Sequence, residues 1–168
     1  MMKDHAKLMQ AFFASGDIVG RKKLQKMIYI AKKLSFPFHE KYQFHFFGPY
    51  SEELTLRVEE LCNMGFLTEQ KEKKSGYIQY RYGVTDEGKA FLASQKADPM
   101  PSLENCLVDL NTQSSRFLEL VATMLYFDGL KEKDLVEKVH KVKGKQNYSN
   151  DEIDQALNYI EHLSMISS

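Results

Sequence analysis

The sequence contains no tryptophan and only two cysteines and four prolines among its 168 residues. Cys62 and Cys106 lie in predicted helices without metal-type spacing, so we expect them to be buried as small apolar residues rather than paired in a disulfide. No apolar run approaches the ~20 residues that a membrane helix needs. The N-terminus also lacks the apolar stretch of a signal peptide. These absences predict a cytoplasmic protein without membrane association.

Patterns of catalytic or metal sites are also missing. The five histidines are scattered without ligand spacing, and the acidic residues fall at helix caps and on predicted solvated faces. Around Gly144 and Lys145 the sequence resembles a phosphate loop only loosely, because the first glycine and the Ser or Thr after the lysine are absent. We therefore predict a basic helix connection there, no catalytic, cofactor-binding or metal-binding residues, and no enzymatic activity. A hydrolase or nucleotide-binding protein without a recognisable motif is the least favoured alternative.

Charge of one sign does not dominate, because 23 Lys and Arg balance 23 Asp and Glu. The balance is uneven along the chain, since residues 1–97 carry a net charge of +5 and residues 98–168 a net charge of −5. Such opposed halves can attract a charged partner or each other across an internal interface. Both alternatives stay open. The 43% of hydrophobic residues is typical of a folded protein.

Periodicity predicts a mainly α protein with a small β component. Helical spacing of apolar residues indicates helices over residues 5–15, 21–35 and 51–64, the last capped by Ser51. Residues 66–84 alternate as two strands around the charged tip 71–76, and Thr85 caps a further helix. This order is that of a winged helix with a β-hairpin wing. We assign residues 1–97 to such a winged-helix-like domain.

The C-terminal half is predicted to be all helical. Pro99 and Pro101 interrupt the pattern, so we place a module boundary near Asp98. Beyond it every apolar period is helical, and Ser149 with Glu152 forms the capping box of a last helix. Residues 98–168 are therefore expected to be a helical extension or subdomain.

The connection between the second and third helices is unusually aromatic. It contains a short predicted strand over residues 41–47 that ends at a Gly-Pro turn, and its aromatic residues are Phe36, Phe38, Tyr42, Phe44, Phe46, Phe47 and Tyr50. So many aromatic residues are too costly to leave in water. We favour their burial as an addition to the hydrophobic core. A protein interface is the alternative, since interface centres also prefer Phe and Tyr.

The helix over residues 51–64 has the wrong charge for reading DNA. In a winged-helix DNA binder the helix before the wing enters the major groove. Here the outward charges sum to −3, from Glu52, Glu53, Arg57, Glu59 and Glu60. A net negative helix forgoes the counterion release that drives binding to phosphates. Nucleic acid is therefore disfavoured.

Nonspecific contact with DNA phosphates stays open through two other elements. The second predicted helix is amphipathic and carries six cations without an acid, namely Arg21, Lys22, Lys23, Lys26, Lys32 and Lys33. The wing tip adds Lys71, Lys73 and Lys74. The basic helix is also suited to holding an acidic protein, and a plain solvated face explains it equally well.

The stretches "GRKKLQKMIYIAKKL" and "FHFFGPYSEEL" resemble the Panacea or SocA-like family of bacterial and phage-associated proteins and, more closely, the related YwgA-like proteins. The resemblance implies small cytoplasmic proteins that act through protein partners: Panacea members as antitoxins, and SocA as an adaptor that delivers a toxin to a protease. The matching residues are Leu24, Gln25, Lys26, Phe47, Gly48 and Pro49. The family pattern has a tryptophan ahead of the Gly-Pro, where this chain has Phe46-Phe47.

We therefore predict a nonenzymatic protein-binding module, with a winged-helix DNA-binding transcriptional regulator as the alternative. The candidate partner-binding residues, which form or support the contact surface, are Lys22, Lys23, Leu24, Gln25, Lys26, Phe46, Phe47, Gly48, Pro49 and Tyr50. Lys71, Lys73 and Lys74 are the candidate phosphate contacts. A homodimer stays open.

Overall fold

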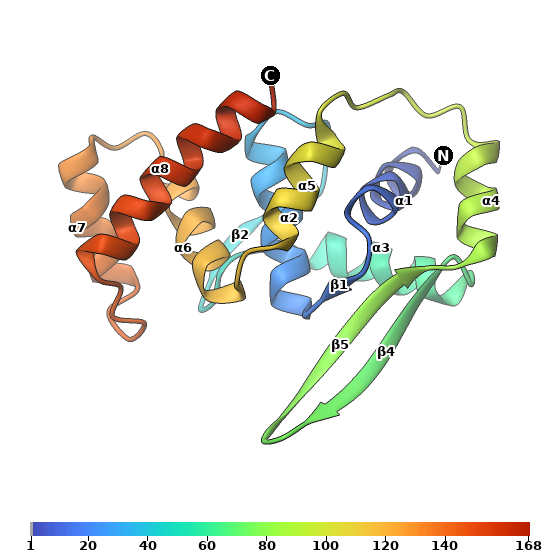
Figure 1. The fold of residues 1–168 in the computed structure, drawn as a ribbon, viewed down its shortest axis with the longest axis horizontal. Helices are drawn as coiled ribbons and strands as arrows, with labels where there is room; N and C mark the ends of the chain where they lie inside the picture. The colour runs from blue at the N-terminus through green and yellow to red at the C-terminus, as the bar shows by residue number, and fades with distance from the viewer. Residues whose placement is uncertain (1) are drawn as a thin grey trace.

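The computed structural model describes residues 2–168 and is mainly helical with a small antiparallel β component (Figure 1), which confirms the predicted fold class. The helices are α1 (Lys3–Ser15), α2 (Arg21–Lys33), α3 (Glu52–Asn63), α4 (Asp86–Ser94), α5 (Leu103–Asn111), α6 (Ser115–Tyr126), α7 (Glu132–Val142) and α8 (Asn150–Ile166). The strands are β1 (Ile18–Val19), β2 (Gln43–His45), β3 (Gly48–Tyr50), β4 (Leu67–Lys74) and β5 (Tyr77–Val84). No helix of residues 2–168 is long and apolar enough to cross a membrane.

The first half has the topology of a winged helix. Strands β1, β5 and β4 form one antiparallel sheet in that order, with Ile18 opposite Tyr82 and Leu67 opposite Val84. The part of the β4–β5 hairpin that extends past its pairing with β1 projects from the helices as a long wing (Figure 1). Strand β1 was not predicted, because two residues are too short to show an alternating pattern.

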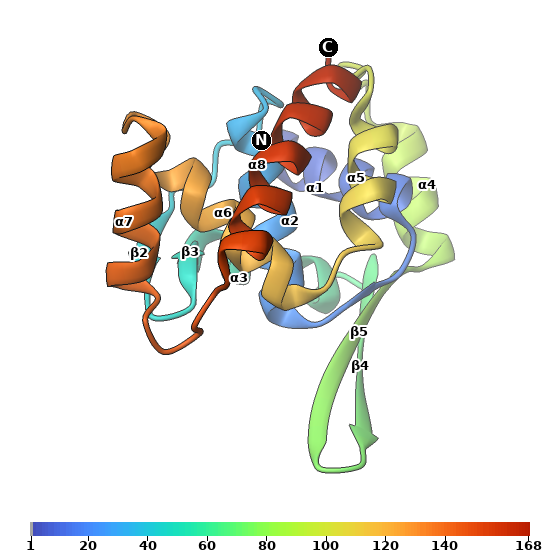
Figure 2. The same ribbon diagram turned by 60° about the vertical axis from the view of Figure 1, so that its left-hand side comes forward.

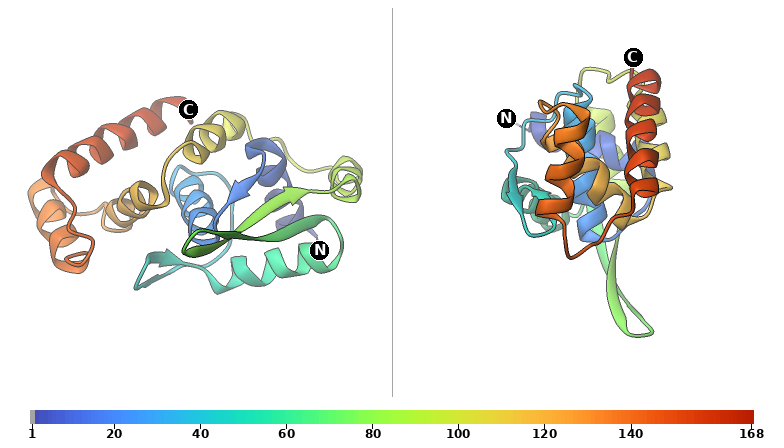
Figure 3. Two further views of the ribbon diagram at one scale, coloured as in Figure 1. Left: turned by 60° about the horizontal axis from the view of Figure 1, so that its bottom comes forward. Right: turned by 90° about the vertical axis from the view of Figure 1, so that its left-hand side faces the viewer.

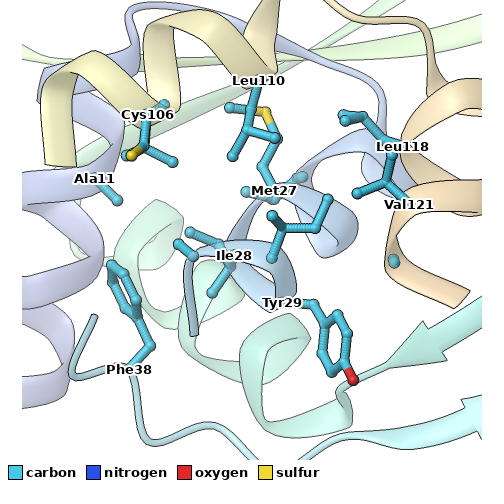
Figure 4. Close-up of a cluster of buried hydrophobic side chains, with 14 of the residues drawn as sticks. Ala11, Met27, Ile28, Tyr29, Phe38, Cys106, Leu110, Leu118 and Val121 are labelled. Carbon is cyan, nitrogen blue, oxygen red and sulfur yellow. The ribbon is translucent and has the colours of Figure 1, made fainter. Parts of the chain in front are cut away.

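Helix α2 lies at the centre of the molecule. All of residues 24–31 are buried, including the polar side chains of Gln25 and Lys26. In Figure 4, Met27 lies among Leu110 of α5 and Leu118 and Val121 of α6. Helix α2 is amphipathic as predicted, but its basic residues do not form one solvated face, because Lys26 is buried beneath other parts of the chain.

One hydrophobic core runs through both halves. It includes Phe12 of α1 and Ile28 of α2 together with Cys106 of α5 and Leu120 of α6. Cys106 is buried as predicted, whereas Cys62 is partly exposed, and both are free thiols. Residues 98–168 therefore complete the packing of residues 1–97 rather than lying apart from them.

The predicted helix caps are confirmed. The Ser51 hydroxyl accepts a hydrogen bond from the backbone N–H of Leu54 at 3.1 Å, so α3 begins where the sequence indicated. Thr85 caps α4 in the same way through Gly88, and Ser149 with Glu152 forms the capping box of α8. The first turn of α3 is thus fixed directly beside the aromatic connection.

The aromatic connection contains a small hairpin. Strand β2 pairs with β3, and His45 lies opposite Gly48, so Phe46 and Phe47 form a two-residue loop. Strand β3 was not predicted, because Gly48-Pro49 was interpreted only as the end of the preceding strand. Phe36 and Phe38 enter the core as favoured, but the two loop phenylalanines do not. The connection therefore contributes aromatic residues both to the hydrophobic core and to the surface.

Candidate protein-contact surface

The feature that stands out on the surface is the aromatic turn, residues 46–49. The Phe46 residue is 62% exposed and Phe47 is 43% exposed, and their rings lie 5.0 Å apart in an edge-to-face arrangement. Fully burying a phenylalanine is worth about 1.5–3 kcal/mol. Two adjacent rings left in water are therefore available to stabilise contact with another molecule.

Gly48 gives the turn its shape. Its φ of 89° lies in the left-handed region that residues with a Cβ rarely adopt. A Cβ at this position would also lie 3.5 Å from the side chains of Lys26, Glu119 and Thr123. The glycine thus allows the loop to turn sharply while lying directly on the helices beneath it.

Helix α2 holds the turn from one side. The Lys26 ammonium donates to the backbone oxygen of Pro49 at 3.0 Å. The Gln25 amide donates to the backbone oxygen of Ser51 and accepts from its N–H, both at 2.9 Å. These two buried residues fix the backbone on both sides of Tyr50, so they support the candidate surface from below rather than contact a partner.

The second half of the chain holds the turn from the other side. The Lys143 side chain, just after α7, donates to the backbone oxygen of Phe46 at 2.7 Å. The same ammonium lies 3.4 Å from a carboxylate oxygen of Glu119 on α6. That oxygen also accepts from Gln146 at 3.1 Å and from the Tyr148 hydroxyl at 3.4 Å. Figure 2 shows α7 beside the β2–β3 hairpin.

Two buried lysines share one carboxylate beneath the turn. Burial lowers the pKa of Lys26 to about 8, opposed by Glu119 and reinforced by Lys143. Burial also lowers the pKa of Lys143, opposed by Glu119. It raises the pKa of Tyr148, and the Glu119 carboxylate adds to that rise. The two lysines are thus held both by hydrogen bonds to backbone carbonyls and by the negative charge of Glu119.

A cavity of about 350 Å³ lies next to Phe47, between α2, α3 and the base of the wing. Its walls include Leu54, Val58 and Tyr82. At its rim, Arg21 pairs with Glu69 at 3.1 Å and stacks 3.7 Å from the centre of the Tyr80 ring. Six candidate residues also line it, namely Lys22, Leu24, Gln25, Lys26, Phe47 and Tyr50. The structure thus brings together most of the residues that the sequence indicated.

Helix α3 presents an acidic outer face. Its one cation, Arg57, pairs with the buried Glu40, with Asp4 of α1 at 3.3 Å and with Glu53 of α3 itself at 3.5 Å. The charged residues left exposed are Glu52, Glu59 and Glu60. The left-hand view of Figure 3 shows α3 continuing from the β2–β3 hairpin alongside the wing.

Most cations of α2 are occupied within the chain. Lys23 donates to the backbone oxygen of Asn111 at the end of α5, Lys32 donates to that of Glu40, and Lys33 pairs with Asp128 at 3.1 Å. The basic run is therefore not a free phosphate-binding face. Lys22 is exposed, with its ammonium 3.4 Å from the centre of the Phe47 ring.

The remaining candidates lie elsewhere. Pro49 is buried, and the hydroxyl of the half-buried Tyr50 lies 2.9 Å from that of Thr55. Lys71, Lys73 and Lys74 are exposed on β4, where they face Tyr80, Ile78 and Tyr77 across the wing. The wing lysines therefore form a separate surface from the aromatic turn.

Sequence reasoning missed Glu119 and Lys143. The available signal for Glu119 was a single carboxylate inside the apolar run "LELVATML", which is typical of a buried charge with a partner. For Lys143 the only signal was its place in the basic connection "KVKGK", which does join α7 to α8 as predicted. Among residues 2–168, no group of three or more His, Cys, Asp or Glu side chains is arranged to hold a metal ion.

The fold and surface define a mainly α-helical, winged-helix-like protein with an anchored aromatic turn. Comparison with models of protein families finds no match. The chain is 62% identical over 166 residues to the uncharacterized protein YwgA of Bacillus subtilis (strain 168), with 99% of each chain covered. The chain therefore belongs to the bacterial YwgA family, as the resemblance in the sequence indicated.

Proposed function

We propose that the protein is a nonenzymatic protein-binding module of the cytoplasm, antitoxin-like or adaptor-like in the manner of the Panacea and SocA-like proteins that it resembles. The observation that carries the proposal is the pair of exposed phenylalanines on a turn whose backbone is fixed from beneath. The proposed regulator acts in toxin or phage-associated systems by holding a partner against this turn.

A rigid aromatic turn favours binding in two ways. Buried aromatic anchors contribute much of the affinity of protein interfaces. Because Lys26 and Lys143 already fix the backbone around Phe47, little conformational entropy is lost when a partner binds. The cavity beside Phe47 adds a recess that an apolar side chain of the partner can enter.

Capture from native lysate, followed by mass spectrometry, tests this proposal. The double variant Phe46→Ala/Phe47→Ala should lose the captured partner. The matched control is Tyr77→Ala/Ile78→Ala on the wing, which removes side chains of similar exposure, 59% and 50%, and should retain it. The mass of the complex from light scattering distinguishes a homodimer from a complex with a different protein. Equal capture by wild type and the Phe46→Ala/Phe47→Ala variant would refute the proposal.

A DNA-binding regulator is the alternative, favoured by the exposed wing residues Lys71, Lys73 and Lys74. Against it, the exposed charges of α3 are all acidic, so the element that enters a groove in winged-helix DNA binders would meet phosphates with the same charge. Binding of random duplex DNA at two salt concentrations separates the alternatives. A steep salt slope, abolished by reversing the three wing lysines, would favour the regulator.

A further inference from the structure

A second hollow, of about 490 Å³, flanks the aromatic turn on the side away from α3. Its lining includes the aromatic side chains of Phe44 and Phe46 and two lysines, Lys141 and Lys145. We call it the basic groove. Because it joins the exposed Phe46 ring to the end of α7, a partner seated on the turn would also cover this groove.

The charged residues that line the basic groove are lysines. Lys141 and Lys145 are exposed, and the Lys145 ammonium lies 5.5 Å from the centre of the Phe46 ring. Lys22 flanks the other side through its contact with Phe47. In the part of the chain that the structure describes, no Asp or Glu lines the basic groove. Glu119 lies below it but is already paired with Lys143.

We propose that the part of the partner that contacts this surface is an acidic peptide segment with an apolar residue between its carboxylates. The apolar residue packs on Phe46, and the flanking carboxylates pair with Lys141 and Lys145. This inference rests on the proposed protein-binding function and adds the chemistry of the partner to it. Charge complementarity directs such a segment, rather than a basic one, to the groove.

A short acidic segment fits this surface better than a nucleic acid does. A nucleic acid extended past Phe47 would reach the neighbouring cavity, which the exposed Glu59 lines and where Arg21 is already paired with Glu69. Its phosphates would then be repelled by carboxylates. The acidic part of a peptide can instead be short enough to stop before it reaches this cavity. One exposed ion pair contributes only about 0.2–1 kcal/mol. The lysines therefore set the preference for the partner, and burial of the aromatic rings supplies most of the affinity.

Fluorescence anisotropy with defined probes tests the inference. The probe is a short fluorescein-labelled peptide in which one phenylalanine is flanked by glutamates. In the control peptide each glutamate is replaced by glutamine. The protein variant is Lys141→Glu/Lys145→Glu. Its matched control, Lys131→Glu/Lys133→Glu, reverses two exposed lysines at the opposite end of α7. Circular dichroism checks that both variants remain folded.

We expect the glutamate peptide to bind more tightly than the glutamine peptide, with affinity that falls as salt rises. The Lys141→Glu/Lys145→Glu variant should weaken binding about tenfold, and the control variant should leave it unchanged. Equal affinity for the two peptides, no binding, or tighter binding of single-stranded oligothymidylate would overturn the inference. If partner capture still depends on Phe46 and Phe47 in that case, the protein-binding function stands and only the acidic segment is wrong.

Discussion

The ammonium of Lys143 lies 2.7 Å from the backbone oxygen of Phe46, across 97 residues of sequence. This contact fastens the aromatic turn of the first half to the helices of the second. Because the same ammonium pairs with Glu119, a carboxylate inside the core also depends on it. The candidate surface is therefore a product of both halves of the chain.

Replacing Lys143 with methionine should destabilise the protein strongly. The variant keeps most of the side-chain volume but leaves Glu119 without its cation, and breaking a buried pair costs roughly 3–5 kcal/mol. Lys141→Met, two residues earlier and exposed, should change the free energy of unfolding by less than about 0.5 kcal/mol. Urea denaturation measures both. Similar small effects in the two variants would mean that Lys143 does not anchor the turn.

The Gly48→Ala substitution should lower stability by about 1–2 kcal/mol, because an alanine is strained at a φ of 89°. Gly129→Ala is the matched control, since a Cβ there would have no atom within 4 Å. The control should be neutral or slightly stabilising. Thermal unfolding of the two variants compares them directly, and a Gly48→Ala protein as stable as wild type would contradict the assigned turn.

Stability should depend on pH through Lys26. Burial lowers the pKa of this ammonium from 10.5 to about 8. Between those pH values the unfolded chain binds more protons at Lys26 than the folded chain does, so the free energy of unfolding rises with pH across the window. The full rise attributable to Lys26 is on the order of 3 kcal/mol.

The Lys26→Met variant isolates this effect. It removes the titrating group but keeps the buried tyrosines, which have raised pKa values and cancel in the comparison. Urea denaturation at several pH values between about 7.5 and 10 should show wild type gaining stability relative to the variant as pH rises. A difference that stays constant over this range would show that Lys26 has an ordinary pKa.

Residues 1–97 should not fold cooperatively without the second half. In the isolated fragment, Met27 and its neighbours on α2 would lose the apolar cover of α5 and α6. The free-energy cost of leaving that much apolar surface in water exceeds the net stability of a small domain. Circular dichroism of the fragment should show no sharp thermal transition, and co-expression with residues 98–168 should restore one. A sharp transition in the fragment alone would identify an independent winged-helix domain.

The sequence was sufficient to predict features that depend on local pattern. Helix positions, the wing, the cap at Ser51 and the acidic outer face of α3 all follow from spacing, capping chemistry and charge within a few residues.

The sequence was insufficient where distant residues meet. Lys26 lies in a run of basic residues that indicates a solvated face, yet its ammonium finds the Pro49 carbonyl inside the protein. The pairing of Lys143 with Phe46 and Glu119 has no local signature at all. Periodicity reports which face of a helix is apolar, not which segment covers it, so the support of the aromatic turn became visible only in three dimensions.

Site-specific photocrosslinking in native cells tests the central claim most directly. The photoreactive residue benzoylphenylalanine replaces Phe46 in one variant and the equally exposed Tyr77 of the wing in another, at 62% and 59% exposure. After irradiation, the variant with the probe at Phe46 should form a covalent adduct with one protein partner, and the Tyr77 variant should not. Adducts formed at Tyr77 and absent at Phe46 would contradict binding through the aromatic turn.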